Sequence, residues 1–158
     1  MNKENLIKNG DFAEGKLEPW VAGGKDVRVF EEEGRYYVRI TPGSNIQQNP
    51  DVPTVATALE FQARAREPLN AGQSILFIAT VFIQLADGIG GPIHLFADYV
   101  SLDNWESYIF KVPQYDNAVM ATLSITPLGA TDARRLMGVE NVGVGTVEFR
   151  MFSLSAIA

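Results

Sequence analysis

The sequence predicts an all-β domain, built as a two-sheet antiparallel β-sandwich of the jelly-roll type. Stretches rich in Val, Ile, Thr, Phe and Tyr alternate along the chain with clusters of Gly, Pro, Asn and Asp. In several stretches apolar and polar residues alternate with period two, as in strands that have one face in a core and one in water. Many short strands with tight connections suit a sandwich. No linker or repeat stands out, so the 158 residues are expected to form a single domain, 1–158.

Turn signals divide the chain between the expected strands. Examples are Glu33-Gly34, Pro42-Gly43, Asp87-Gly88 and Asp103-Asn104, whose residue types favour tight-turn backbone conformations. In chain order the expected strands are Asn5–Ile7, Val27–Glu31, Arg35–Thr41, Asn45–Gln48, Val55–Arg66, Ser74–Leu85, Ile93–Tyr99, Trp105–Val112, Val119–Thr126 and Thr146–Leu154. A helical turn is expected at Thr131–Met137.

Alternation assigns a core face and a solvent face to three of these strands. The core-facing residues are expected to be Tyr36, Val38, Ile40, Val55, Leu59, Phe61, Ala63, Ala65, Val119, Ala121, Leu123 and Ile125. The opposite faces are polar and include Tyr37, Arg39, Glu60, Gln62 and Arg64.

The strand expected at Ser74–Leu85 is apolar on both faces, because Leu76, Ile78 and Phe82 lie opposite another apolar set. Such a strand is covered on both faces, by a loop, a ligand groove or another subunit. Leu76, Ile78 and Phe82 are therefore the candidate interface residues if the chain forms a homo-oligomer.

Charge and hydropathy exclude several classes of partner. The chain has 19 acidic and 13 basic residues, for a formal net charge of −6, and an acidic surface repels nucleic acid and anionic lipid. The most apolar run, Ile75–Leu85, is far shorter than the roughly 20 residues of a membrane helix, so no membrane insertion is expected. The first residues lack a signal-peptide core, which predicts cytoplasmic synthesis or a module excised from a secreted protein.

The sequence contains no recognisable set of catalytic residues. Cysteine is absent, which excludes disulfides, thiolate metal sites and cysteine nucleophiles. The single histidine, His94, lies among apolar neighbours, where a surface or hydrogen-bonded structural role is expected. No nucleotide-binding or hydrolase motif is present, and no spacing selects a pair of carboxylates for glycoside hydrolysis. The sequence predicts no enzyme.

Several motifs follow one another in a recognisable order. The chain opens with Asn5-Leu6-Ile7-Lys8-Asn9-Gly10-Asp11-Phe12-Ala13-Glu14-Gly15, followed by Pro19-Trp20. Further along come Tyr36–Ile40, Asn45–Gln48, Leu59–Ala65 and Trp105–Pro113. In these motifs the chain resembles the jelly-roll carbohydrate-binding modules appended to xylanases and cellulases, within the galactose-binding-like sandwiches. The resemblance implies that fold and a non-catalytic, lectin-like role with a glycan or polysaccharide as partner.

Many such modules carry a structural calcium ion, and the resemblance places Asp11 and Glu14 among its ligands. The final strand has Arg150 where the family has an aspartate, and a guanidinium cannot bind a cation. The sequence therefore predicts no cofactor, with calcium at Asp11 and Glu14 as the alternative. Without calcium, Arg150 is the expected partner of one of these carboxylates.

Glycan binding needs aromatic faces for sugar C–H groups, and amides, carboxylates and guanidiniums for hydroxyls. On a concave sheet face, the expected stacking residues are Trp20 and Tyr37, and the expected hydrogen-bonding residues are Arg39, Gln47, Glu60, Gln62 and Arg64. Trp105 is expected in the core, and the acidic run Glu31–Glu33 at a solvated hairpin end. The alternative function is a self-assembling structural subunit of a particle, filament or appendage.

Overall fold

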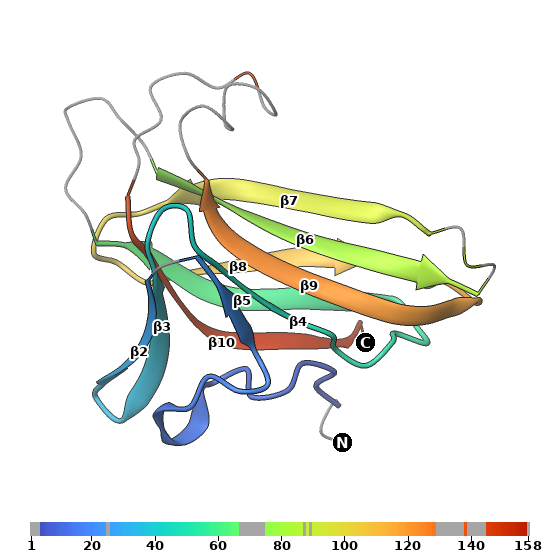
Figure 1. Cartoon of the computed structure of the whole chain (residues 1–158), viewed down its shortest axis with the longest axis horizontal. Coiled ribbons are helices and arrows are strands. Elements are labelled where there is room, and N and C mark those ends of the chain that lie inside the picture. Colours follow the sequence, from blue (N-terminus) through green and yellow to red (C-terminus); the bar gives the residue numbers. More distant parts are fainter. Residues whose placement is uncertain are drawn as a thin grey trace.

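Two five-stranded antiparallel sheets pack face to face in the structure, which is a computed structural model (Figure 1). It describes residues 4–24, 26–66, 75–86, 88, 90–128, 138 and 145–157. Sheet A has the order β1-β4-β9-β6-β7, with strands β1 Val21–Gly23, β4 Asn45–Gln48, β9 Ala118–Leu128, β6 Ile75–Leu85 and β7 Ile93–Val100. Sheet B has the order β2-β3-β10-β5-β8, with strands β2 Val27–Glu32, β3 Arg35–Ile40, β10 Val147–Ala156, β5 Thr57–Ala65 and β8 Glu106–Val112.

The predicted all-β jelly-roll sandwich is confirmed, and nine of the expected strands lie within two residues of an observed one. The strand expected at Asn5–Ile7 is wrong, although the Leu6 N–H donates to the Leu154 carbonyl oxygen at 2.9 Å. Strand β1 was not predicted, because three residues containing a glycine show no alternation. The helical turn expected at Thr131–Met137 lies outside the described residues.

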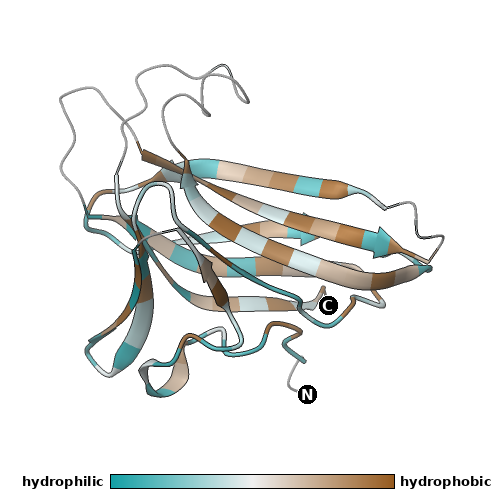
Figure 2. Ribbon diagram, viewed as in Figure 1, coloured by the Kyte–Doolittle hydropathy of each residue, from teal (hydrophilic) through white to brown (hydrophobic). Residues whose placement is uncertain are grey.

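Aromatic side chains fill the space between the sheets. Phe61 of β5 lies 5.2 Å from Phe77 of β6 and 5.8 Å from Phe149 of β10, measured between ring centroids. Figure 2 shows hydropathy alternating along β9, with the apolar residues of one phase entering this core. Burial of apolar surface on this scale supplies most of the favourable free energy of folding.

The N-terminal motif closes one end of the sandwich. Phe12 is fully buried, with its ring 6.0 Å from Phe152 and 5.9 Å from Trp20. The Asn9 side chain holds the loop: its amide donates to the carbonyl oxygens of Lys16 and Glu18, and its oxygen accepts from the Ala13 N–H. The motif thus has a structural role.

Strand β6 is buried on both faces within one chain. Leu76 is 0% exposed and forms a second buried cluster with Ile78 and Leu128, separate from the main core. Leu76 and Ile78 therefore cannot serve as an exposed interface, and that interpretation is corrected; Phe82 is half-buried. No helix in the described residues is long and apolar enough to cross a membrane.

Candidate functional site

The outer face of sheet B carries a row of alternating charges that the strand register creates. Arg39 of β3 and Arg64 of β5 lie directly opposite Glu148 of β10, one on each side. Glu148 is 0% exposed, and its carboxylate accepts hydrogen bonds from Arg39 Nε at 2.8 Å and Arg64 Nε at 2.7 Å. Arg66 Nε lies 3.6 Å from the same carboxylate. A buried carboxylate that accepts hydrogen bonds from several guanidiniums orders the strands around it.

Aromatic rings pack against these guanidiniums. Trp105 has the Cζ of Arg64 at 4.2 Å and the Cζ of Arg150 at 4.1 Å from its ring centroid. Arg39 lies over Phe30 at 4.2 Å, and Phe30 stacks on Tyr37 at 5.8 Å. These cation–π contacts stabilise the cluster, with each worth about 0.5–2 kcal/mol depending on its exposure.

The β2–β3 hairpin reaches the same cluster from its tip. Glu32 accepts two hydrogen bonds from Arg64, at 3.1 Å and 2.7 Å, and one from Trp105 Nε1 at 3.4 Å. The hydrogen bonds from Arg64 hold the pKa of Glu32 below its usual value despite the opposing effect of desolvation. Burial lowers the pKa of Arg64, but the hydrogen bonds and charges of Glu32 and Glu148 outweigh it and raise that pKa overall. We call Glu32, Arg64, Trp105, Glu148 and Arg150 the arginine cluster.

Trp20 and Tyr37 do not offer the exposed rings that the sequence predicts. Trp20 is 2% exposed, packs 5.0 Å from Phe152, and donates its ring N–H to the Asn9 carbonyl oxygen at 3.0 Å. Tyr37 is 7% exposed beneath Phe30 and Trp105. The stacking roles are therefore corrected, since neither ring presents a face to a ligand.

The predicted hydrogen-bonding residues do not form one stripe. Arg39 and Arg64 belong to the internal charge row, and Gln62 accepts from Arg150 Nε at 2.7 Å. Glu60 is exposed on sheet B, whereas Gln47 is exposed on sheet A.

Two residues of the arginine cluster, Trp105 and Glu32, were not predicted as site residues. Trp105 was assigned to the core and Glu32 to a solvated hairpin end. Trp105 directly precedes β8 and lies two residues before Ser107, which pairs with the outward-facing Gln62, so the alternation of this strand predicts an outward side chain.

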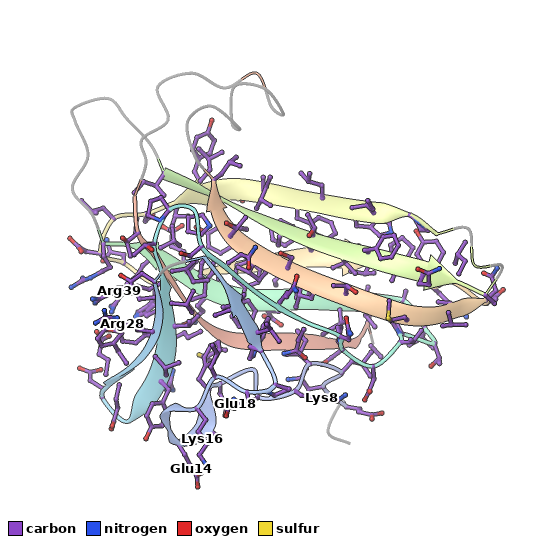
Figure 3. All side chains as sticks on the ribbon, viewed as in Figure 1. Lys8, Glu14, Lys16, Glu18, Arg28 and Arg39 are labelled. Carbon is purple, nitrogen blue, oxygen red and sulfur yellow. The ribbon has the colours of Figure 1, made fainter. Side chains whose placement is uncertain are left out.

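The expected pairing of Arg150 with Asp11 or Glu14 is wrong, because its Nε donates to Gln62 instead. Glu14 points away from the body of the molecule (Figure 3) and lies 3.3 Å from Lys16 Nζ. The described residues contain no group of three or more His, Asp or Glu side chains placed to hold a metal ion. Calcium binding stays a prediction of the resemblance.

A hollow of about 540 Å³ lies on sheet B beside the arginine cluster. Gln62 and Ser107, which pair across β5 and β8, line it, and Gln62 also accepts the hydrogen bond from Arg150. Its other lining residues are Asn5, Ile7, Asn9, Gly10, Asp11, Glu60, Phe61, Met151, Phe152 and Ser153. The wall combines amides, hydroxyls and carboxylates with a comparable apolar surface.

The outer face of sheet A has a different chemistry. One register row crosses all five strands and contains Val21, Gln47, Ser124, Thr80 and Leu95. With about 4.8 Å between neighbouring strands, four intervals give a row about 19 Å long. That length suits an oligosaccharide better than a single ring.

No charged residue lies on this outer face within the five described strands of sheet A. The residues of this side, which alternate with the core-facing ones, are the accessible Val21, Gly23, Asn45, Gln47, Thr80, Phe82, Gln84, Ile93, Leu95, Ala97, Tyr99, Met120, Thr122, Ser124 and Thr126 and the buried Leu76, Ile78 and Leu128. Charged residues make up 20% of the chain, so their exclusion from this face is a distinct feature. We call this set the neutral face.

Hydroxyls and amides occupy the middle of the neutral face, and exposed apolar side chains flank them. Val21 is 58% exposed on one edge strand, and Leu95 is 48% exposed on the other. Thr122 donates its hydroxyl to Asn49 at 2.9 Å and lies opposite Phe82. Neutral donors and acceptors between apolar contacts can bind hydroxylated, uncharged ligands.

His94, the single histidine of the sequence, has a structural environment. Its Nε2 lies 2.6 Å from the Tyr115 hydroxyl, and its ring stacks on Phe96 at 6.3 Å. This is the hydrogen-bonded structural role expected from the sequence.

Comparisons with known proteins agree with the fold. A family model described as a carbohydrate binding domain matches residues 4–125. A sequence search against proteins of curated function found no match.

Solved structures share the architecture at low identity. A family 61 carbohydrate-binding module in complex with β-1,4-galactotriose has a TM-score of 0.66 at 15% identity, covering 98% of this chain and 99% of that one. A Clostridium thermocellum xylanase structure, comprising a family 22 module and a catalytic module with xylohexaose, has a TM-score of 0.70 at 13% identity, covering 100% of this chain and 29% of that one. The family 22 xylan-binding domain of Paenibacillus barcinonensis Xyn10C has a TM-score of 0.64 at 16% identity, covering 99% and 97%.

Proposed function

This chain belongs to the carbohydrate-binding domain family, whose members bind glycans without catalysis, and from that premise we propose that it binds a neutral oligosaccharide on the neutral face of sheet A. The observation that carries the proposal is the five-strand row of hydroxyl, amide and apolar side chains without a charge. Uncharged sugars offer many hydroxyls and apolar C–H surfaces, which match such a row.

The arginine cluster makes sheet B the weaker candidate for a neutral glycan. The Arg39 and Arg64 guanidiniums there are already hydrogen-bonded to the buried Glu148 carboxylate, and breaking a buried ion pair costs about 3–5 kcal/mol. Exposed Gln47, by contrast, has no hydrogen bond to another described side chain and can bind a ligand without losing an internal partner.

The ligands of two structural neighbours support this choice of ligand class. The complexes with β-1,4-galactotriose and xylohexaose both contain uncharged chains of pyranoses. We infer that a β-linked neutral oligosaccharide of this kind is the ligand, lying across the strands from Val21 toward Leu95.

Calorimetric titration with xylohexaose and with β-1,4-galactotriose tests the proposal. Gln47→Ala and Thr80→Val each remove a hydrogen-bonding group from the row with little change to the backbone. Each is expected to weaken binding about 2–12-fold, the equivalent of one hydrogen bond of about 0.5–1.5 kcal/mol. Leu95→Ser is expected to weaken binding through lost apolar contact.

Glu60→Gln on sheet B is the matched control, because Glu60 is exposed and lies away from the neutral face. It is expected to leave the affinity unchanged. Loss of binding in Glu60→Gln together with wild-type affinity in Gln47→Ala would move the site to sheet B. Absence of binding to both sugars and to a wider panel of neutral glycans would overturn the proposal.

A further inference from the structure

Arg150 carries a charge that the surrounding cluster does not neutralise. Within the described part of the chain its hydrogen bond goes to the neutral Gln62 oxygen, and no carboxylate lies within ion-pair distance. Arg64, by contrast, is hydrogen-bonded to two carboxylates, those of Glu148 and Glu32. Together with Arg39, which also pairs with Glu148, the arginine cluster has three guanidiniums against two carboxylates, although the chain has a formal net charge of −6.

The positive charges of neighbouring arginines repel the Arg150 guanidinium. Burial and then the charges of Arg35 and Arg64 lower the pKa of Arg150, against a smaller opposing effect of Glu32 and Glu33. Arg35 itself contacts the Met151 sulfur at 3.6 Å rather than a carboxylate. An anion placed among these guanidiniums would relieve this repulsion.

Glu32 already shows how a carboxylate binds there. Both of its oxygens face the Arg64 guanidinium, in the two-bond arrangement that arginine forms with carboxylates, and Trp105 Nε1 is a further donor. Glu32 lies at the end of β2, with its side chain 38% exposed, whereas the Arg64 side chain is 6% exposed. Rotation of the Glu32 side chain would uncover this donor set without unfolding a strand.

We propose that the arginine cluster is a second binding site, specific for a sugar acid, in which the ligand carboxylate takes the position that Glu32 holds. Arg64, Arg150 and Trp105 bind the carboxylate. The pyranose ring lies in the adjoining hollow, where Gln62 and Ser107 face its hydroxyls. Glu32 is an intramolecular competitor that sets the affinity.

A uronic acid fits this arrangement better than a small inorganic anion. Gln62 joins the two parts of the site, because it bonds Arg150 and also lines the hollow of about 540 Å³. A sulfate ion would use the guanidiniums alone and leave the hollow empty of contacts. The site is independent of the neutral face, which lies on the other sheet.

Calorimetric titration with trigalacturonate at low salt tests this inference on wild type, Glu32→Gln and Arg150→Met. Glu32→Gln removes the competing charge and is expected to bind at least about tenfold more tightly than wild type. Arg150→Met keeps the length of the side chain but loses a charge-assisted hydrogen bond of about 1.5–3 kcal/mol, so affinity is expected to fall about 10–100-fold.

Arg28→Gln and Glu33→Gln are the matched controls, since each makes the same change of charge near the cluster. Arg28 is exposed and pairs with Asp26, and Glu33 is exposed at the hairpin turn. Arg28→Gln is expected to bind as wild type does, and Glu33→Gln, whose charge acts on Arg150 less strongly than that of Glu32, is expected to gain far less affinity than Glu32→Gln. Thermal unfolding of every variant verifies that it is folded.

Three results would overturn the inference: Glu32→Gln binding no better than Glu33→Gln, Arg150→Met binding as well as Arg28→Gln, or sulfate displacing trigalacturonate at equal concentration. The neutral-glycan proposal fails separately. Binding of xylohexaose or galactotriose is expected to persist in Glu32→Gln and Arg150→Met and to weaken in Gln47→Ala.

Discussion

Single residues in the N-terminal motif determine how the chain closes the sandwich. Gly10 is required because a Cβ there would lie 2.1 Å from the Phe152 carbonyl oxygen, and the Phe152 N–H donates to the Gly10 carbonyl oxygen at 2.9 Å. This close approach places Phe12 and Trp20 against Phe152. The motif therefore encodes backbone contact and core packing, which explains why its tryptophan is unavailable to a ligand.

Trp20→Ala is expected to reduce the free energy of unfolding by about 3–5 kcal/mol, because it leaves a cavity among buried rings. Trp105→Ala, at a half-buried position, is the matched comparison and is expected to cost about 1–2 kcal/mol through lost cation–π contacts. Urea unfolding followed by far-UV circular dichroism measures both. Equal losses in the two variants would contradict the core position of Trp20.

The Glu32–Arg64 pair predicts a pH dependence of stability. The pKa of Glu32 is lowered in the folded state from its ordinary value of 4.5, chiefly by its hydrogen bonds from Arg64. The folded state thus binds the carboxylate proton less readily than the unfolded state does. The stabilisation is complete above pH 4.5 and is lost as the pH falls through the lowered folded value.

Wild type and Glu32→Gln are therefore expected to differ most in unfolding free energy above pH 4.5 and to converge at lower pH. The difference is expected to be small and to shrink with added salt, because the carboxylate is partly exposed. Urea titrations from neutral pH downward measure it. A difference that grows as the pH falls would contradict the sign.

Among the strands, β6 has apolar residues on both faces, and this pattern alone does not identify an interface between subunits. One face enters the inter-sheet core through Phe77 and Val81, and Leu76 on the other face is buried with Ile78 and Leu128 inside the same chain. The central position of β6 between β7 and β9 makes such double coverage stabilising.

Leu76→Ala is expected to reduce the free energy of unfolding by about 2–5 kcal/mol, as for a buried leucine in a packed cluster. The loss is expected to be independent of protein concentration. Chemical unfolding at concentrations about a hundredfold apart tests this, since coupling to association makes stability depend on concentration. A concentration-dependent loss would restore Leu76 as an interface residue. Leu95→Ala on the exposed edge strand is the control, with little expected loss.

For the whole molecule, the sandwich presents two outer faces of opposite character. The neutral face of sheet A lacks charge within the described strands, and sheet B carries the arginine cluster. Because the two sheets pack back to back, a ligand on one face has no contact with a ligand on the other. The fold can thus carry two sites that respond differently to solution conditions.

Salt is expected to separate the two sites. Raising the salt concentration from about 0.05 M to about 0.5 M shortens the screening length severalfold, which weakens interactions between exposed charges. Affinity for trigalacturonate is expected to fall at least about fivefold over this range, whereas affinity for xylohexaose is expected to change less than about twofold. Isothermal titration at matched ionic strengths measures both. A strong salt dependence of xylohexaose binding would contradict a neutral-face site.

The sequence by itself determined nine of the strands, most of their core faces and the family, whereas Val55 and Val119, expected in the core, are exposed. Alternation at Leu59, Phe61 and Ala63 is a local property that one register satisfies, and the N-terminal motif carries its own turn and anchor. Tight turn residues defined most strand ends, so little of this depended on distant contacts.

The tertiary structure decided which polar residues share a face. Gln47 and Arg64 look alike as outward polar residues of strands, but strand order places them on opposite sheets. Arg64 becomes buried because Glu148, 84 residues away, and the tip of a distant hairpin converge on it. Local periodicity reports which side of a strand faces outward, whereas strand pairing and sheet curvature set what covers that side, and these arise from long-range contacts that spacing along the chain does not encode.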